Sequence, residues 1–267
     1  NLNRTSESEE QFAKAKEIAL ANESSVANAA SAFQMYHQFQ HAIDIYERAE
    51  KKFPNKKYGL EIGNIYSVEK NYEQMMEHYL DYLNGETLAT IESRLSYVLA
   101  NDSEDKAEPI IEKALIAQAQ KKPNSASLNS LTIWLYTQTG RNEMALNQLI
   151  AYNKRAAQSN DKEIVEFGNE MAEIGEYETS IRAFNYLVKR KTRSVLHNEA
   201  YIGLLNVSYK KAVSKLNPDI NELKALDSTI NLALKELAIT KAYDIIITSA
   251  QLKAFYLNKY DEAIAVI

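Results

Sequence analysis

The four histidines are the residues of this chain whose chemistry is easiest to assess. His37 and His41 lie four positions apart, a spacing that puts two imidazoles on one face of a helix, where both could bind a metal ion. The stretch between them is predicted to turn, however, and a turn breaks that geometry. We therefore interpret both as solvated turn residues, and the sequence predicts no metal site.

Paired carboxylates are the next candidates, because general acid–base chemistry often uses two of them. Glu170 and Glu173, like Glu9 and Glu10, lie in strongly charged stretches, which favour a solvated helix face. The sequence contains no glycine-rich phosphate loop, nucleophile elbow or HExxH stretch. It also contains no cysteine, which excludes disulfides, thiolate zinc sites and thiol catalysis. We therefore expect a segment without enzyme activity and without a cofactor.

Composition predicts the elements that would carry any site. With seven glycines, four prolines and 45% hydrophobic residues among 267, the chain is typical of an all-α protein. The net charge of −5 offers no basic footprint for nucleic acid. The densest apolar stretch, 242–250, is too short to span a membrane and contains Asp244 and Thr248. The charge therefore predicts that the partner is not a nucleic acid, and the short apolar stretch predicts no membrane insertion.

The first residue is Asn1 rather than Met, which fits a processed or trimmed chain. Removal of a secretory signal would explain it, so export to a periplasmic or extracellular space is the expectation, with a cytoplasmic location as the alternative.

Aligning the chain with itself reveals a repeat. Ala42, Tyr46 and Ala49 lie at i, i+4 and i+7, one face of a helix. The same face recurs at a stride of about 34 residues, which is typical of stacked helical hairpins. Its further copies are Met75, Tyr79 and Tyr82, then Ala107, Ile111 and Ala114, then Ala145, Leu149 and Tyr152, and then Ser180, Phe184 and Leu187.

The few glycines of the chain have two different roles within this repeat. Gly63, Gly168 and Gly203 lie inside the first helix of a predicted pair, where the missing Cβ lets the second helix approach closely. Gly140 and Gly175 follow the last turn of a first helix, where a positive φ favours glycine.

This pattern resembles the tetratricopeptide repeat, a helix–turn–helix unit of about 34 residues. The best match is Phe167, Gly168, Gly175, Tyr177 and Phe184, with Ser180 in place of a small alanine. Another unit keeps Ile62, Gly63, Tyr66, Tyr72 and Tyr79, but Lys70 and Asn71 stand where the turn glycine is expected. The resemblance implies a right-handed α-solenoid of degenerate repeats.

The predicted organisation is one solenoid over 1–267. Its lone first helix covers 6–21 and an incomplete unit covers 241–267, so we expect further repeats or an effector domain after Ile267. The unit at 194–238 is longer than the others, with a helix of about 22 residues from Ser194 that Asn217 and Pro218 end. Its arm is either a local elbow or a docking surface. The remaining hairpins are predicted at 24–55, 57–85, 87–122, 125–158 and 162–192.

Trp134, the only tryptophan, lies two residues before Tyr136 and therefore on another face of its helix. The resemblance implies that this face lines a concave groove. The equivalent helix face in the other units completes a predicted partner-binding groove. Its residues are Gln34, Met35, Lys57, Asn64, Ser67, Trp134, Thr137, Gln138, Asn169, Glu173 and His197.

The expected function is a non-enzymatic scaffold that binds a peptide or a partner protein in this groove. Some proteins of the resembled family grip a C-terminal carboxylate with paired basic residues, but Lys57 is the only basic candidate here, which disfavours that mode. The alternative is a ligand- or peptide-sensing segment of a larger signalling protein of bacterial type. A helical-toroid enzyme would require an acidic pocket.

Overall fold

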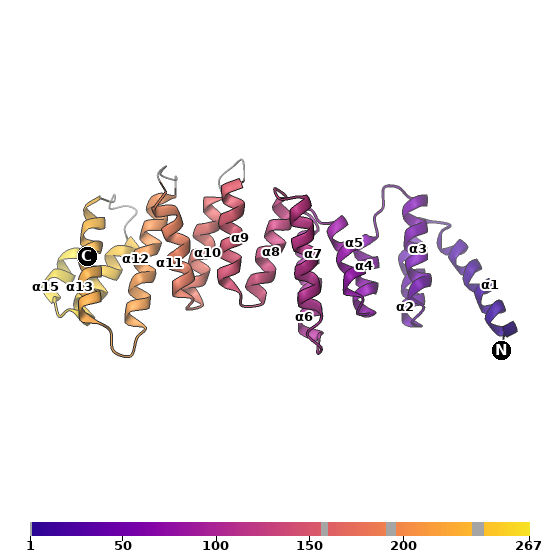
Figure 1. The fold of residues 1–267 in the computed structure, drawn as a ribbon, viewed down its shortest axis with the longest axis horizontal. Coiled ribbons are helices and arrows are strands. Elements are labelled where there is room, and N and C mark those ends of the chain that lie inside the picture. Colours follow the sequence, from indigo (N-terminus) through magenta and orange to yellow (C-terminus); the bar gives the residue numbers. More distant parts are fainter. Residues whose placement is uncertain (1, 156–159, 191–195, 237–242) are drawn as a thin grey trace. The chain divides into compact units, whose positions relative to one another are not determined.

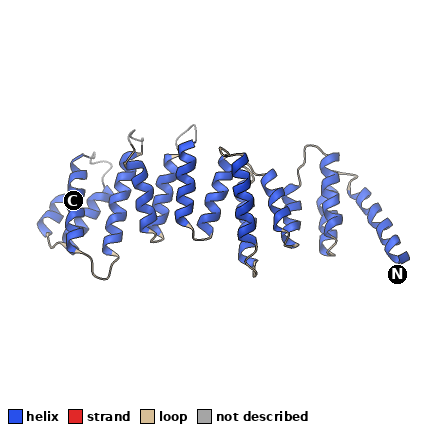
Figure 2. Cartoon of the chain, viewed as in Figure 1, coloured by secondary structure: helices blue, strands red, loops and turns tan. Residues whose placement is uncertain are grey.

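The computed structural model describes residues 2–155, 160–190, 196–236 and 243–267. In this part of the chain all regular structure is helical, with fifteen α-helices and one π-helical turn (Figure 2). The all-α class predicted from composition and repeats is therefore confirmed. The chain divides into two compact units, Asn1–Trp134 and Leu135–Ile267.

The first unit begins with α1 (Leu2–Ala19), which packs against α2. Successive helices then pair as antiparallel hairpins (Figure 1). The pairs are α2 (Glu23–Met35) with α3 (Phe39–Lys52), α4 (Gly59–Val68) with α5 (Tyr72–Asp81), and α6 (Leu88–Asn101) with α7 (Ala107–Lys121). Helix α8 (Ala126–Gln138) contains the boundary between the units.

The second unit continues the series. It comprises α9 (Asn142–Arg155), the pair α10 (Asp161–Glu173) and α11 (Tyr177–Val188), and the pair α12 (His197–Val213) and α13 (Ile220–Glu236). The last pair is α14 (Tyr243–Gln251), extended by the π-helical turn Leu252–Tyr256, and α15 (Tyr260–Val266). Some boundaries of the predicted units lie outside the described residues, namely 158, 192, 194, 238 and 241.

Helix α12 is shorter than the predicted helix of about 22 residues. It has 17 residues and ends at Val213, ahead of Asn217 and Pro218. Ser194, where the prediction began, lies outside the described residues. Helix α12 packs against α10, α11, α13 and α14.

Several turns between consecutive helices share one backbone conformation, a single left-handed residue. Gly140 and Gly175 have φ of 70° and 85°, as predicted for turn glycines. In four of these turns, the N–H of the residue after the left-handed one donates a hydrogen bond to the carbonyl five residues earlier, with N···O distances of 2.7 to 2.9 Å. This is the hydrogen-bond pattern of a Schellman motif. Four residues that are not glycine adopt the same left-handed conformation at φ of 53° to 56°: His37, Lys70, Asp105 and Asn258.

The glycines inside the first helices lie against aromatic rings. A Cβ on Gly63 would come within 2.4 Å of the Tyr79 ring, and one on Gly168 within 2.8 Å of the Phe184 ring. Both rings belong to the second helix of the same hairpin, which confirms the predicted close approach. Ser180, which replaces the small alanine of the repeat, donates a hydrogen bond of 2.6 Å to the Gly168 carbonyl.

Gly203 differs from the prediction in its partner. It lies in α12, the first helix of its pair, but a Cβ there would come within 2.6 Å of Phe184 in α11. The close approach is therefore made to the preceding hairpin and not to α13. The reason is that α12 packs along α11, and its glycine faces that helix.

A buried ion pair joins α13 to the π-helical turn. The side chains of Asp227 and Lys253 are each only 4% exposed and are hydrogen-bonded to one another. The Lys253 ammonium also donates to Asn231 Oδ1 at 2.9 Å and to Ser249 Oγ at 3.0 Å. Lys259 donates to the second Asp227 oxygen at 3.0 Å. All three ammonium donors of Lys253 therefore have acceptors.

We predict that Asp227→Asn destabilises the fold by about 3–5 kcal/mol at neutral pH, because it leaves the Lys253 charge buried without its counterion. Burial opposes ionisation of Asp227, but the bonds from Lys253 and Lys259 outweigh it and hold the Asp227 pKa below its ordinary value. The stabilisation is therefore complete above the ordinary aspartate pKa and is lost as the pH falls through the lowered one.

Urea unfolding of the wild type and Asp227→Asn, repeated from pH 7 down to pH 2, measures this. The difference in unfolding free energy should shrink only at the acidic end. Glu236→Gln, which changes an exposed carboxylate on α13, serves as the control. A difference that stayed constant over the whole pH range would contradict the prediction.

The ring contact at Gly168 makes a second prediction. Gly168→Leu should lower the free energy of unfolding by about 1–3 kcal/mol or more, because the new side chain overlaps the buried Phe184 ring. Gly85→Leu is the matched control, since no atom lies within 4 Å of a Cβ built at Gly85. Equal urea midpoints for the two variants would show that the contact is not tight.

Candidate functional site

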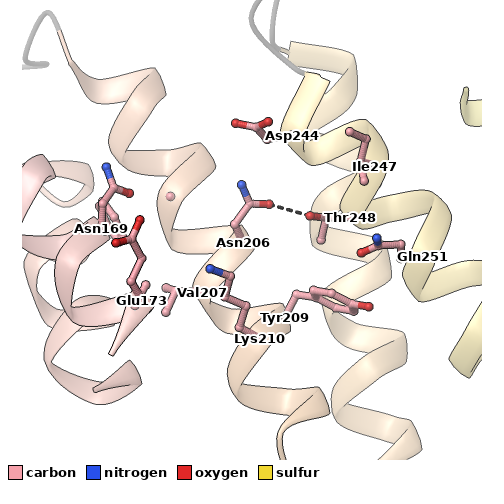
Figure 3. A pocket seen from close by; sticks show the side chains of 13 residues that line it. Asn169, Glu173, Asn206, Val207, Tyr209, Lys210, Asp244, Ile247, Thr248 and Gln251 are labelled. Carbon is pink, nitrogen blue, oxygen red and sulfur yellow. Dashed lines mark hydrogen bonds between the residues drawn. The ribbon is translucent and has the colours of Figure 1, made fainter. Parts of the chain in front are cut away.

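A cavity of about 460 Å³ opens in the second unit between α10, α12 and α14, which are the first helices of three consecutive hairpins (Figure 3). From α10, Asn169, Ala172 and Glu173 line it, at positions i, i+3 and i+4. This spacing places the three side chains on one face of the helix, so α10 presents a continuous stripe to the cavity.

The floor of the cavity is apolar. Val207 of α12 and Phe184 of α11 lie there, each only 1% exposed. Gly203 lies beside them and, lacking a Cβ, leaves the Phe184 ring at the surface of the cavity. Ile247 of α14 forms a wall and remains 53% exposed. These groups can receive an apolar side chain of a ligand.

The rim carries an amide that is held in place. Thr248 of α14 is mostly buried, and its hydroxyl donates a hydrogen bond of 2.8 Å to Asn206 Oδ1 of α12. In Figure 3 the amide nitrogen of Asn206 lies on the side away from Thr248. Because the amide oxygen is engaged, the NH₂ group is presented as a donor. Asn206 is therefore preorganised to bind an acceptor such as a backbone carbonyl.

Three charged side chains, one from each helix, complete the rim. Glu173 comes from α10, Lys210 from α12 and Asp244 from α14. Within the described part of the chain no ion pair joins any two of them. The neighbouring Lys211, in contrast, forms an ion pair of 2.5 Å with Glu178 of α11. The three rim charges are thus available to a ligand, in the order negative, positive, negative across the helices.

Of the eleven sequence-predicted groove residues, Asn169 and Glu173 line this cavity. Asn64 and Ser67 lie together on one turn of α4, where the Ser67 hydroxyl donates to the Asn64 carbonyl at 2.7 Å. The others do not line the cavity: Gln34 and Met35 lie on α2, Lys57 lies in the loop before α4, Trp134, Thr137 and Gln138 lie on α8, and His197 begins α12.

These positions differ in exposure. Met35 is 78% exposed, whereas Trp134 and His197 are half-buried. Lys57 precedes the first residue of α4, so it does not share the helix face on which the prediction placed it.

The repeat alignment missed most of the cavity. Asn206, Lys210, Asp244 and Thr248 were not predicted, because the equivalence carried along the repeat led to His197, at the start of α12. A signal did exist in the sequence. Counting from Gly203, the cavity face of α12 follows at i+3, i+4 and i+7, the periodicity of one helix stripe.

The described residues contain no group of three or more histidine, aspartate or glutamate side chains that could hold a metal ion. None of their helices is long and apolar enough to cross a membrane.

No protein-family model matches the sequence, and a search of curated proteins finds no match either. Among solved structures, the chain is similar to a tetratricopeptide repeat protein from Parabacteroides merdae ATCC 43184, whose crystal structure was determined at 2.39 Å. The TM-score is 0.32 at 12% identity, over 95% of this chain and 77% of that one. The assignment of the fold therefore rests on the helices described above.

Proposed function

We propose that this chain is a non-enzymatic protein-interaction module that holds an extended peptide, or a loop of a partner protein, in the cavity between α10, α12 and α14. The observation that carries the proposal is the preorganised amide of Asn206 above an apolar floor. An extended backbone needs hydrogen-bond partners for its carbonyl and N–H groups, and its side chains need pockets. The cavity offers both within one stack of hairpins.

Two amides would bind the peptide backbone, and the apolar floor would bind one peptide side chain. Asn206 presents its NH₂ group to a backbone carbonyl, and Asn169 on α10 can donate or accept at the next peptide group. One apolar side chain of the peptide enters between Val207 and Ile247. Because all these groups stand on helices rather than loops, little conformational entropy is lost when the peptide binds.

The proposal is for binding rather than catalysis. The polar groups of the cavity are amides, the Thr248 hydroxyl that is already hydrogen-bonded to Asn206, the Tyr209 phenol, one ammonium and two carboxylates. None of its residues is a histidine or a cysteine. We also propose that the predicted groove residues outside the cavity, Trp134 among them, contact a partner protein.

Blocking the cavity tests its role. We predict that peptides selected by the wild-type chain from a phage-displayed random library bind Ile247→Arg at least about tenfold more weakly, because the arginine fills the entrance. Leu232→Arg is the matched control, since Leu232 is 60% exposed on α13 and does not line the cavity. Fluorescence anisotropy with the selected peptides measures both. Selection of no peptide, or equal loss in the two variants, would refute the proposal.

Trp134 offers a separate test outside the cavity. If it contacts the partner, Trp134→Ala should weaken binding of a captured partner protein while lowering Tm by only a few degrees, because buried aromatic anchors dominate many interfaces. Calorimetry of the free chain and a binding titration measure the two quantities. A large fall in Tm with unchanged affinity would instead make Trp134 a core residue.

A further inference from the structure

The last described hairpin carries an apolar groove. It has a volume of about 360 Å³ and is lined by α14, by the π-helical turn that extends α14, and by α15. Along both helical segments the lining residues recur at i, i+3, i+4 and i+7, beginning at Ile247 in α14 and at Tyr260 in α15. This spacing is that of one helix face, so the groove lies between two continuous stripes.

Small residues form the bottom of this groove and large apolar side chains form its sides. Ala250 and Ala263 line it and are only 8% and 5% exposed. Phe255 and Ile264 line it as well, and each is 75% exposed. Clustered exposure of large apolar side chains is uncommon on a protein surface and marks interaction sites. The short alanine side chains leave room for the backbone of an occupant to approach closely.

The two preceding hairpins show what covers a face of this kind. Helix α12 packs on both α10 and α11, and α14 packs on both α12 and α13. In each case the first helix of the next hairpin lies against both helices of the hairpin before it. The α14–α15 hairpin presents a corresponding face, whose apolar side chains remain exposed in the described part of the chain.

We propose that this groove docks an amphipathic helix supplied by another polypeptide, in the way that α12 covers α10 and α11. The segments that join the helices within residues 1–267 have at most eight residues, too few for a helix of this kind. The site and its helical occupant go beyond the proposed peptide binding in the cavity between α10, α12 and α14, although Ile247 lines both surfaces.

Helix α12 shows which residues a covering helix places against the preceding hairpin. Gly203 lies against Phe184 of α11, where a Cβ would come within 2.6 Å of the ring. Ala200 and Val207 lie on the same stripe, three residues before and four residues after Gly203, and are 0% and 1% exposed. The covering stripe therefore has a small residue between two buried apolar residues.

Helix α14 has a similar stripe. Ile245 and Leu252, seven residues apart, are buried in one cluster with Leu223 and Ile230 of α13. Ser249 lies between them and is fully buried. We expect the docked helix to follow the same rule, with apolar residues at i and i+7, a small residue at i+3 or i+4, and polar residues on its opposite face.

A library of helical peptides tests this docking on the full chain. Peptides of about twenty residues on an alanine, glutamate and lysine framework are displayed on phage and randomised at i, i+3, i+4 and i+7. Peptides selected by the wild type should carry a small residue at i+3 or i+4, and their circular dichroism should show added helix on binding. Replacing that small residue by leucine should weaken binding at least about tenfold, because the added volume holds the helix away from the alanines.

Ile264→Arg tests the location of the site. Ile264 is exposed, so the arginine leaves the core intact, but it puts a charge at the side of the groove and should weaken the selected helices at least about tenfold. Ile174→Arg is the matched control, since Ile174 is 60% exposed after α10 and does not line the groove. Fluorescence anisotropy measures both variants. Hydrogen exchange followed by mass spectrometry should slow in 243–267 when a selected helix binds.

The outcomes decide between occupants. Selection of no helix, equal loss in the two variants, or binding that tolerates leucine at the small position overturns the inference. A wild-type dimer in sedimentation that Ile264→Arg dissociates assigns the groove to a second copy and overturns it too. A natural form that continues past Ile267 and no longer binds the selected helices assigns the groove to the same chain, with the same consequence.

The proposed peptide binding is decided separately. Peptides selected for the cavity should bind Ile264→Arg as they bind the wild type, because Ile264 does not line the cavity. They should lose affinity only in Ile247→Arg. Helix docking can therefore fail while peptide binding stands, and the reverse result is equally distinguishable.

Discussion

The Phe184 ring packed against bare backbone is the contact on which the second unit depends. Gly168 of α10 and Gly203 of α12 both face it, and a Cβ at either position would overlap it. One buried ring therefore fixes the distance between α11 and two first helices at once. A larger residue at either glycine would push a helix outward, because packed interiors leave no space to absorb it.

The same contact shapes the candidate site. Phe184 and Gly203 form part of the cavity floor, and Asn206 and Lys210 lie one and two turns further along α12. The groups that a peptide would meet are thus displayed from the helix whose position the ring determines. Packing and binding depend on the same residues in this unit, since the residues that close the core also define the depth of the cavity.

How far the sequence predicts the structure depends on the kind of interaction. The hairpins, the glycines Gly63 and Gly168 at aromatic contacts, and the turn glycines follow from local periodicity and from what glycine alone can do. Lys70 shows the limit. Its left-handed backbone matches that of Gly140 in an equivalent turn, although lysine rarely adopts it, because the packing of the flanking helices overrides local preference. Asn169 and Glu173 were predicted as groove residues because the repeat alignment carried the groove face implied by the family resemblance onto this helix. Asn206, Lys210 and Asp244 were not, because their positions depend on how α12 and α14 lie against the earlier helices.

The position of α14 has its own physical basis, away from the cavity. Helix α14 continues into the π-helical turn, and there Lys253 is bound to Asp227 of α13, with Ser249 of α14 as a further acceptor. A π-helical turn inserts one extra residue and rotates the side chains that follow it. The buried charge then favours the one rotation in which Lys253 meets its acceptors. Ser249 follows Thr248 directly in α14, so the bonds that hold Lys253 also hold the part of α14 whose Thr248 orients Asn206. A buried pair of this kind often adds little net stability, and its role here is to select a single arrangement of the helix that carries one side of the site.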